Sequence, residues 1–517
     1  MRFGLDDDGV VVIIGSGAGG GTLANELCQR GIRCVLLEAG RQFTLADFEH
    51  DEFAMTRKFI WPDAPDNTSP PPLDRERPHV CKGVGGTTLH WSGLALRLEA
   101  HELAARRSYG AISGAALADW PIPADELALW YARAEEKMGV TGTGDRPLLP
   151  GNNNFKVLYN GGRQLGYRHI STGRLAINSR PRDGRPACIQ MGFCLQGCRI
   201  GAKWSTLYTE IPRAEATGRL ELRADCTALQ IVHDNRHRVS GVLYADSEGR
   251  QQLQHARAVC VAANSVESAR LLLNSASAAF PDGLANSSGQ VGRNYTSHVH
   301  EFVMAEMPAP VHYYRGTVQA GLVEDERGHD PRRGFAGGYL LQAISFGLPF
   351  TALALLPGVW GPRLATLVEN YTHLAGLVIL GEDLPQSDNR VTLSSTRKDR
   401  FGLPLPGIHR RTHPNDTALM HHARERATAL YESLGARRSY VAGSTGLTHN
   451  LGTNRMSRSP RDGVVNPWGQ CHDIANLFIS DGSQFPTSGA ANPTLTIVAL
   501  AMRQAGYIAG QMTARAI

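Results

Sequence analysis

Val10-Val-Val-Ile-Ile14-Gly15-Ser-Gly17-Ala-Gly-Gly20 is the stretch that decides the fold of this chain. Five consecutive apolar residues of strand length predict a buried β-strand, and the glycine-rich turn follows it directly. Apolar residues at helical spacing in 23–27 then predict a helix, and a second apolar run, Arg33-Cys-Val-Leu-Leu-Glu38, predicts another buried strand. The first 40 residues therefore predict a βαβ unit whose second strand ends on an acidic residue.

The spacing of the glycines predicts a dinucleotide-binding turn. Gly15 suits a tight turn, Gly17 lets the backbone approach a pyrophosphate, and Gly20 allows close helix packing at the helix N-terminus. Glu38 follows Gly15 by 23 residues and is the expected ligand of a free ribose hydroxyl rather than of a 2′-phosphate. The alternative is a purely structural turn. The position between a strand and a helix favours the nucleotide.

A second glycine loop, Gly83-Val-Gly-Gly-Thr-Thr-Leu-His90-Trp-Ser-Gly93, favours one large, extended cofactor. FAD fits this arrangement better than NAD. An ordinary surface loop is the alternative, although it has little reason to keep Leu89 and Trp91 among four glycines.

Composition excludes several classes of protein. The 517 residues carry 53 Lys+Arg against 48 Asp+Glu, a net charge of +5, which argues against electrostatic nucleic-acid binding. Nine thinly spread cysteines do not form a secreted disulfide framework and favour a reducing compartment. We expect no signal peptide and a cytoplasmic location. The apolar stretch Phe346–Leu380 is interrupted by prolines and charges, so we expect no transmembrane segment.

The rest of the chain predicts an α/β protein, α+β overall, with a Rossmann-like FAD-binding domain and a second, antiparallel-sheet substrate-binding domain. Short strands and a helix in 220–275 extend the nucleotide domain, whereas alternating runs in 301–442 predict the separate sheet. A strand near 476–480 and a final apolar-faced helix return to the first domain. We predict a discontinuous FAD domain of residues 1–100, 200–300 and 445–517, and a substrate domain of residues 101–199 and 301–444.

The middle of the chain shows no chemical constellation beyond scattered polar residues. Examples are His298, His300, Glu382 and Asp383. For each of these we expect a structural role.

Three C-terminal runs carry a family resemblance: His449-Asn-Leu-Gly-Thr-Asn-Arg-Met456, Asn476-Leu-Phe-Ile-Ser-Asp-Gly-Ser483 and Asn492-Pro-Thr-Leu-Thr496. Together with Gly292-Arg-Asn294 and Asn389-Arg-Val-Thr-Leu393, they make the chain resemble the glucose–methanol–choline (GMC) family of flavin oxidoreductases over nearly its whole length.

The resemblance implies an enzyme that oxidises a CH–OH group to a carbonyl with FAD. His449 would take the hydroxyl proton, hydride would pass to flavin N5, and Asn492 would hold the oxygen. The expected cofactor-binding residues are Gly15, Gly17, Gly20, Glu38, Gly85, Gly86, Thr87, His90, Asp481, Gly482 and Thr494.

Two of these assignments have structural alternatives. Asn492 precedes Pro493, the pattern of a helix N-cap with proline at the first helical position, and both roles can hold together. His449, one of 19 histidines, could be a satisfied structural residue. His90 lies in a His-Trp loop similar to that of pyranose oxidases, where flavin is attached covalently; a hydrogen bond or a packing role is the default expectation.

Three cysteines, Cys188, Cys194 and Cys198, lie close enough in sequence to converge on one metal or iron–sulfur cluster. Large subunits of membrane-linked sugar and gluconate dehydrogenases in the family are similar here and hold a three-iron cluster. Their doubled cysteine is Ala187-Cys188 in this chain, which removes one candidate ligand. Reduced structural cysteines, an unused relic and a disulfide are the alternatives.

The loop and cysteine similarities imply sugars, glycosides, polyols or related alcohols as substrates. They favour a dehydrogenase that passes electrons to a quinone, cytochrome or partner subunit, with oxygen-using oxidases and non-redox FAD-containing lyases as alternatives. They also imply a small subunit that could carry the chain to the periplasm by co-export.

Overall fold

A five-stranded parallel sheet holds together segments that lie far apart in the sequence. The computed structural model describes residues 2–352, 359–443 and 446–517, and the strand order in this sheet is β19-β10-β1-β2-β6. Its strands are β1 (Val11–Ile14), β2 (Cys34–Leu37), β6 (Leu220–Arg223), β10 (Ala258–Val261) and β19 (Leu477–Ile479). Every neighbouring pair is parallel, so the predicted βαβ unit and Rossmann-like sheet are confirmed.

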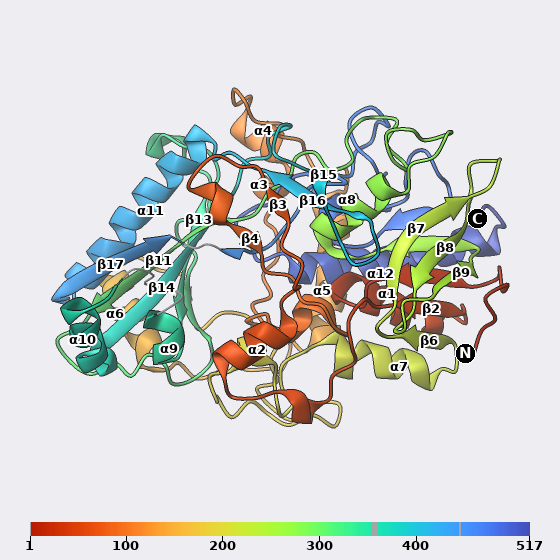
Figure 1. The fold of residues 1–517 in the computed structure, drawn as a ribbon. Helices are drawn as coiled ribbons and strands as arrows, with labels where there is room; N and C mark the ends of the chain where they lie inside the picture. Colours follow the sequence, from red (N-terminus) through yellow and green to blue (C-terminus); the bar gives the residue numbers. More distant parts are fainter. Residues whose placement is uncertain (1, 353–358, 444–445) are drawn as a thin grey trace.

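Both faces of this sheet are covered, which explains its continuous apolar strands. Side chains of β1 alternate between two hydrophobic clusters, Val12 and Ile14 in one and Val11 and Ile13 in the other. Helices α1 (Ala18–Gln29) and α7 (Glu210–Ala216) contact its strands, and strand β8 (Val239–Ala245) contacts β10. Helix α12 (Thr494–Thr513) packs on α1, and α5 (Ala124–Met138) packs on α12. Both chain termini lie beside this sheet (Figure 1).

A six-stranded sheet forms the other half of the molecule, on the left of Figure 1. Its order is β17-β11-β14-β13-β12-β5, and all of its neighbouring pairs are antiparallel. The strands are β5 (Ile170–Ser171), β11 (Val299–Glu306), β12 (Gln319–Val323), β13 (Tyr339–Ile344), β14 (Leu374–Gly381) and β17 (Arg438–Gly443). Helices α6 (Asn153–Gln164) and α11 (Pro414–Glu432) pack against it. The predicted antiparallel sheet is confirmed.

The remaining strands form three smaller sheets. Two of the strands predicted in 220–245, β7 and β8, join no parallel sheet but pair antiparallel with each other and with β9. The members are β7 (Thr227–His233), β8 (Val239–Ala245) and β9 (Gln251–His255); β3 (Asp66–Asn67), β15 (Arg390–Lys398) and β16 (Pro404–His409); and β4 (Arg77–Pro78) with β18 (Gly446–Leu447).

The remaining helices are mostly short: α2 (Glu52–Phe59), α3 (Ala100–Leu103), α4 (Ala105–Tyr109), α8 (Asn264–Asn274), α9 (Leu348–Phe350) and α10 (Pro362–Glu369). Helix α8 is the helix predicted within 220–275, and at its start the Asn264 side chain accepts hydrogen bonds from the backbone N–H groups of Val266 and Glu267.

The apolar stretch Phe346–Leu380 contributes α9, α10 and the fully buried strand β14, while 353–358 lie outside the described residues. Within the described ranges, no helix combines the length and the apolar character that crossing a bilayer requires.

Candidate active site

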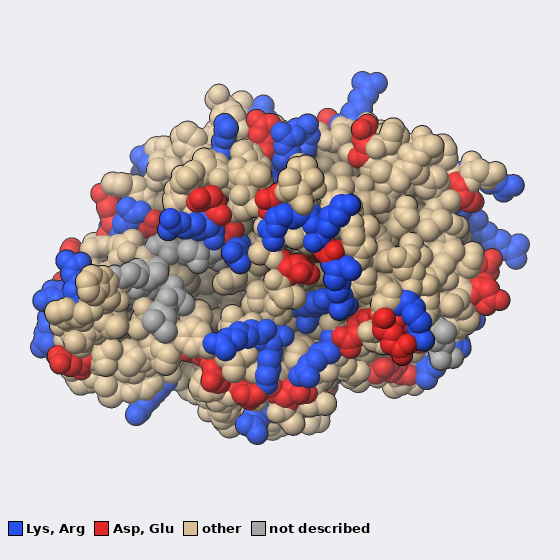
Figure 2. All heavy atoms as spheres, viewed as in Figure 1, with Lys and Arg blue, Asp and Glu red and all other residues tan. Residues whose placement is uncertain are grey.

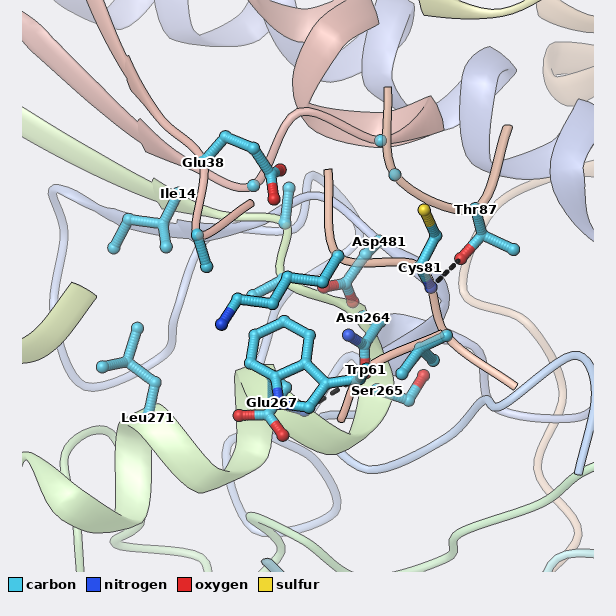
Figure 3. A pocket seen from close by; sticks show the side chains of 18 of the residues that line it. Ile14, Glu38, Trp61, Cys81, Thr87, Asn264, Ser265, Glu267, Leu271 and Asp481 are labelled. Atoms are coloured by element: carbon cyan, nitrogen blue, oxygen red, sulfur yellow. Dashed lines mark hydrogen bonds between the residues drawn. The ribbon is translucent and has the colours of Figure 1, made fainter. Parts of the chain in front are cut away.

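One elongated cavity follows the carboxyl ends of the parallel strands. Its lining continues β1 at Gly15, β2 at Glu38, β10 at Ala262 and β19 at Asp481, and it extends to His449. The carboxyl edge of a parallel sheet is where nucleotide ligands bind in open α/β folds. Figure 3 shows Glu38, Thr87 and Asp481 around this cavity.

In the first glycine turn, the fold itself requires some of the glycines, whereas another has no such requirement. A Cβ on Gly20 would lie 1.9 Å from the Gly15 carbonyl oxygen, and Gly15 itself has a φ of +94°, so protein geometry requires glycine at both positions. Gly17 differs: a Cβ there would meet only the Gly86 Cα, at 3.9 Å. Packing within the protein therefore does not require glycine at position 17. Because Gly17 lines the cavity, the space that a side chain would fill belongs to the cavity.

The N-terminus of helix α1 lies at the cavity, carries the positive end of the helix dipole and has no side-chain cap. Gly17 is its N-cap residue, no side chain caps it, and its first turn holds no acidic residue. Helix N-termini of this kind bind phosphate groups through their unpaired N–H groups.

Glu38 is tied to both glycine loops through Ser16. The Ser16 hydroxyl donates to Glu38 Oε2 at 2.7 Å and accepts from the Gly85 N–H at 2.9 Å. The Ser16 and Gly40 N–H groups also donate to the Glu38 carboxylate, at 3.1 and 3.0 Å. Burial raises the pKa of Glu38. Sequence reasoning missed Ser16, because its partner Gly85 lies 69 residues away.

In the second glycine loop, Gly86 and Thr87 line the cavity, but Gly85 and His90 do not. Gly85 has a φ of +104°, the conformation that a turn here requires of glycine. The His90 Nε2 atom is buried and has no hydrogen-bond partner among the described residues. Burial lowers the pKa of His90 to about 3, so its ring is neutral.

The C-terminal runs contribute to the same lining. Asp481 lines it and accepts hydrogen bonds from the Ser268 hydroxyl at 2.5 Å and the Ser483 N–H at 2.9 Å. Gly482 also lines it, and a Cβ there would lie 2.7 Å from Leu451. Thr494, the first residue of α12, lies on the same lining.

His449 and Asn492 lie side by side, and of the two only His449 lines the cavity. The Asn492 Nδ2 atom lies 3.3 Å from His449 Nε2, and His449 lines the cavity. His449 has a φ of +58°, a left-handed conformation that non-glycine residues adopt mainly where the surroundings enforce it. An imidazole nitrogen beside an amide N–H can take a proton from a hydroxyl group whose oxygen the amide holds.

The Asn492 side chain does not cap helix α12, so that structural alternative is wrong. The helix begins at Thr494 with Pro493 at the N-cap, and no side chain caps it. Instead, buried Gln342 of β13 donates from Nε2 to Asn492 Oδ1 at 3.1 Å. This bond leaves the Asn492 N–H groups directed at His449. Gln342 gave no signal in the sequence, because only tertiary structure brings it to this site.

Burial lowers the pKa of His449 well below its usual value, and the neighbouring His298 and His300 lower it further. The imidazole is therefore neutral and able to accept a proton at neutral pH. His298, for which the sequence predicted only a structural role, lies with its Nδ1 atom 3.0 Å from His449 Nδ1.

The three clustered cysteines are free thiols that pack against the same hydrophobic cluster. The Lys203 N–H donates to Cys198 Sγ at 3.4 Å, the Gln190 N–H donates to Cys188 Sγ at 3.3 Å, and burial raises the pKa of Cys194. In the part of the chain that the structure describes, no group of three or more His, Cys, Asp or Glu side chains could hold a metal ion. The predicted cysteine ligands therefore do not fit an iron–sulfur cluster in this arrangement.

Lys and Arg side chains gather in the middle of the face shown in Figure 2, with Asp and Glu among them. Lys82 and Arg400 line the cavity together with Asp63 and Glu267. The charge around the cavity is thus mixed.

The chain is similar in sequence and in fold to several known proteins. The chain is 34% identical to 2-methyl-1,2-propanediol dehydrogenase of Mycolicibacterium austroafricanum, over 96% of this chain and 94% of that protein. It is 28% identical to the fructose dehydrogenase large subunit of Gluconobacter japonicus, over 96% and 97%. Its fold is similar to that of a pyridoxine 4-oxidase ("Mesorbium loti"), with a TM-score of 0.68, 16% identity and coverage of 96% and 98%. Two family profiles described as GMC oxidoreductase match residues 4–300 and 385–501, so the chain belongs to the GMC oxidoreductase family.

Proposed function

We propose that this protein oxidises a CH–OH group of a sugar, glycoside, polyol or related alcohol to a carbonyl, using FAD and an electron acceptor other than NAD. The observation that carries the proposal is the His449–Asn492 pair, 3.3 Å apart, because His449 lines the same cavity as the glycine turn that precedes α1. The names of the two relatives, a diol dehydrogenase and a fructose dehydrogenase subunit, support the substrate class.

The residues present fit FAD. The uncapped N-terminus of α1 suits a pyrophosphate, Glu38 suits a ribose hydroxyl, and Gly17 leaves room that the protein itself does not use. When bound, FAD supplies the hydride acceptor. The other predicted cofactor residues belong to the same proposal: Gly15, Gly86, Thr87, Asp481, Gly482 and Thr494 line the cavity, whereas Gly20, Gly85 and His90 lie behind its lining in the two glycine loops.

The proposed chemistry of the protein groups is a proton transfer. A substrate hydroxyl that replaces the direct contact between the pair donates its proton to His449 Nε2, while its oxygen accepts a hydrogen bond from Asn492 Nδ2. The same contacts orient the carbinol carbon. Loss of the hydroxyl proton makes departure of the hydride from that carbon easier.

We further propose the two-domain division given above and a small-subunit or cytochrome partner, with co-export to the periplasm. The word "large subunit" in the name of the fructose dehydrogenase relative supports a partner. An iron–sulfur cluster on Cys188, Cys194 and Cys198 rests on resemblance alone, and we derive no step through it.

Anaerobic mixing of the FAD-loaded enzyme with candidate diols and ketoses tests the proposal. We expect a true substrate to bleach the oxidised-flavin absorbance, because hydride transfer needs no second substrate. Stopped-flow absorbance measures the rate. Turnover with the flavin oxidised throughout would contradict the proposal and indicate a lyase.

The low pKa of His449 gives an expected pH profile. A base whose pKa is lowered stays deprotonated as the pH falls, so kcat/KM is expected to remain level below about pH 6.5, the usual histidine pKa. The measurement is kcat/KM against pH, with enzyme integrity checked by return to neutral pH. A fall centred at or above about pH 6.5 would assign the base to a more exposed group.

A further inference from the structure

A chain of hydrogen bonds continues behind the His449–Asn492 pair. His298 Nε2 lies 2.7 Å from the Gly489 carbonyl oxygen, and His298 Nδ1 lies 3.0 Å from His449 Nδ1. The two rings are nearly perpendicular, with centroids 4.9 Å apart. His298 is 1% exposed, so its nitrogens have to be satisfied by protein groups.

The Gly489 carbonyl at the end of this hydrogen-bond chain determines which ring nitrogen of each histidine carries the proton. A carbonyl oxygen only accepts, so His298 must carry its proton on Nε2. In a neutral ring the other nitrogen, Nδ1, then has only a lone pair. His449 must therefore donate to it, which puts the His449 proton on Nδ1 and leaves the lone pair on Nε2. That lone pair is the one that faces Asn492.

The backbone around His298 holds this contact in place. Thr296 and Leu451 exchange backbone hydrogen bonds at 3.2 and 2.9 Å, and the Ser297 hydroxyl donates to the Thr448 carbonyl at 2.7 Å. The segment just before His298 is thus bonded to the chain on both sides of His449. At the other end, the Ala490 N–H donates to Glu102 Oε1 at 2.7 Å and fixes the peptide beside Gly489.

We propose that His298 is a positioning residue that holds His449 in the tautomer whose Nε2 can accept a proton from the substrate. The inference rests on the proposed role of His449 as the base. Gln342 acts in the same way from the opposite side, because its bond to Asn492 Oδ1 directs Nδ2 at His449. A hydroxyl that contacts both side chains thus meets one acceptor and one donor.

The surroundings keep His298 neutral, as this role requires. Burial lowers the pKa of His298 to about 4, and the neighbouring charged or titratable groups are Glu102, His300 and His449. A protonated His298 would have no lone pair for His449 Nδ1.

Two substitutions separate this role from simple packing. In His298→Asn the amide oxygen takes the place of Nδ1 and can still accept from His449. In His298→Gln the amide nitrogen can still donate to the Gly489 carbonyl, but no acceptor remains at the Nδ1 position. We expect His298→Gln to lower the rate of anaerobic flavin reduction at saturating substrate about 10²- to 10³-fold, and His298→Asn less than about tenfold.

A spectroscopic readout accompanies the rates. In FAD-loaded enzyme with ring-¹⁵N-labelled histidine, the His449 signals are those absent from His449→Ala. We expect wild type and His298→Asn to carry the His449 proton on Nδ1, and His298→Gln to show a mixture of tautomers. A His449 proton on Nε2 in the wild type would overturn the inference, even if His298→Gln fails to fold.

The outcomes also separate this inference from the proposed function. Activity retained in His449→Ala removes the base assignment and the inference with it. An inactive His449→Ala together with wild-type rates in His298→Gln overturns only the inference. Equal losses in the Gln and Asn variants would indicate packing alone.

Discussion

His449→Ala is expected to lower the rate of flavin reduction by substrate about 10²- to 10⁴-fold, the range that general acid–base groups contribute. The substitution removes the only predicted base, while Asn492, still oriented by Gln342, can hold the substrate oxygen. The rate at saturating substrate should therefore decrease strongly, while the substrate concentration that gives half of that rate should change little. Anaerobic stopped-flow absorbance separates the two.

Two controls accompany this variant. His472→Ala removes a histidine outside the cavity lining, whose Nε2 lies 3.2 Å from the Ser457 hydroxyl, and should leave the rate within about twofold. Added imidazole should restore part of the activity of His449→Ala, because the vacated space borders the cavity. A wild-type rate in His449→Ala would show that proton removal does not depend on this ring.

Local sequence patterns predicted the parts of the fold that short-range chemistry determines. The apolar run at 10–14, the glycines after it and the acid at Glu38 each have a local physical reason, and the structure has β1, α1 and β2 in that order. Helix α11 was missed although its buried face, Leu419, Ala423, Ala427 and Leu430, has a helical period. Treating 301–442 as strands alone concealed that signal.

The candidate site was predictable only where motif residues make it. Ser16, His298 and Gln342 act through partners 69, 151 and 150 residues away, so no local pattern identifies them. Asn492 illustrates the opposite error. Its sequence context is that of a helix cap, yet tertiary contacts with Gln342 and His449 take its side chain instead. Long-range hydrogen bonds therefore outweigh a local preference worth about 1 kcal/mol.

Gly20→Ala is expected to weaken FAD retention on the order of 100-fold or more. Its Cβ would lie 1.9 Å from the Gly15 carbonyl oxygen and 3.1 Å from the Ala262 side chain, and the first of these neighbours is backbone. The Gly15 turn must therefore move, and it lines the cavity where the phosphates are proposed to lie. Backbone displacement of this kind costs about 1–3 kcal/mol or more, and each 1.4 kcal/mol is about tenfold in affinity.

Gly506→Ala is the matched control, since it makes the same chemical change inside another helix of the parallel-sheet region. Gly506 lies in α12, is exposed, and a Cβ there meets nothing within 4 Å. Alanine should stabilise that helix by about 0.5–1 kcal/mol. Flavin retained after gel filtration and the thermal unfolding temperature are measured for both variants. If Gly20→Ala loses flavin and unfolds at a lower temperature while Gly506→Ala keeps flavin and unfolds at a higher one, the turn at Gly15, rather than helix propensity, decides cofactor binding. Equal flavin retention in the two variants would remove the proposed phosphate site from this turn.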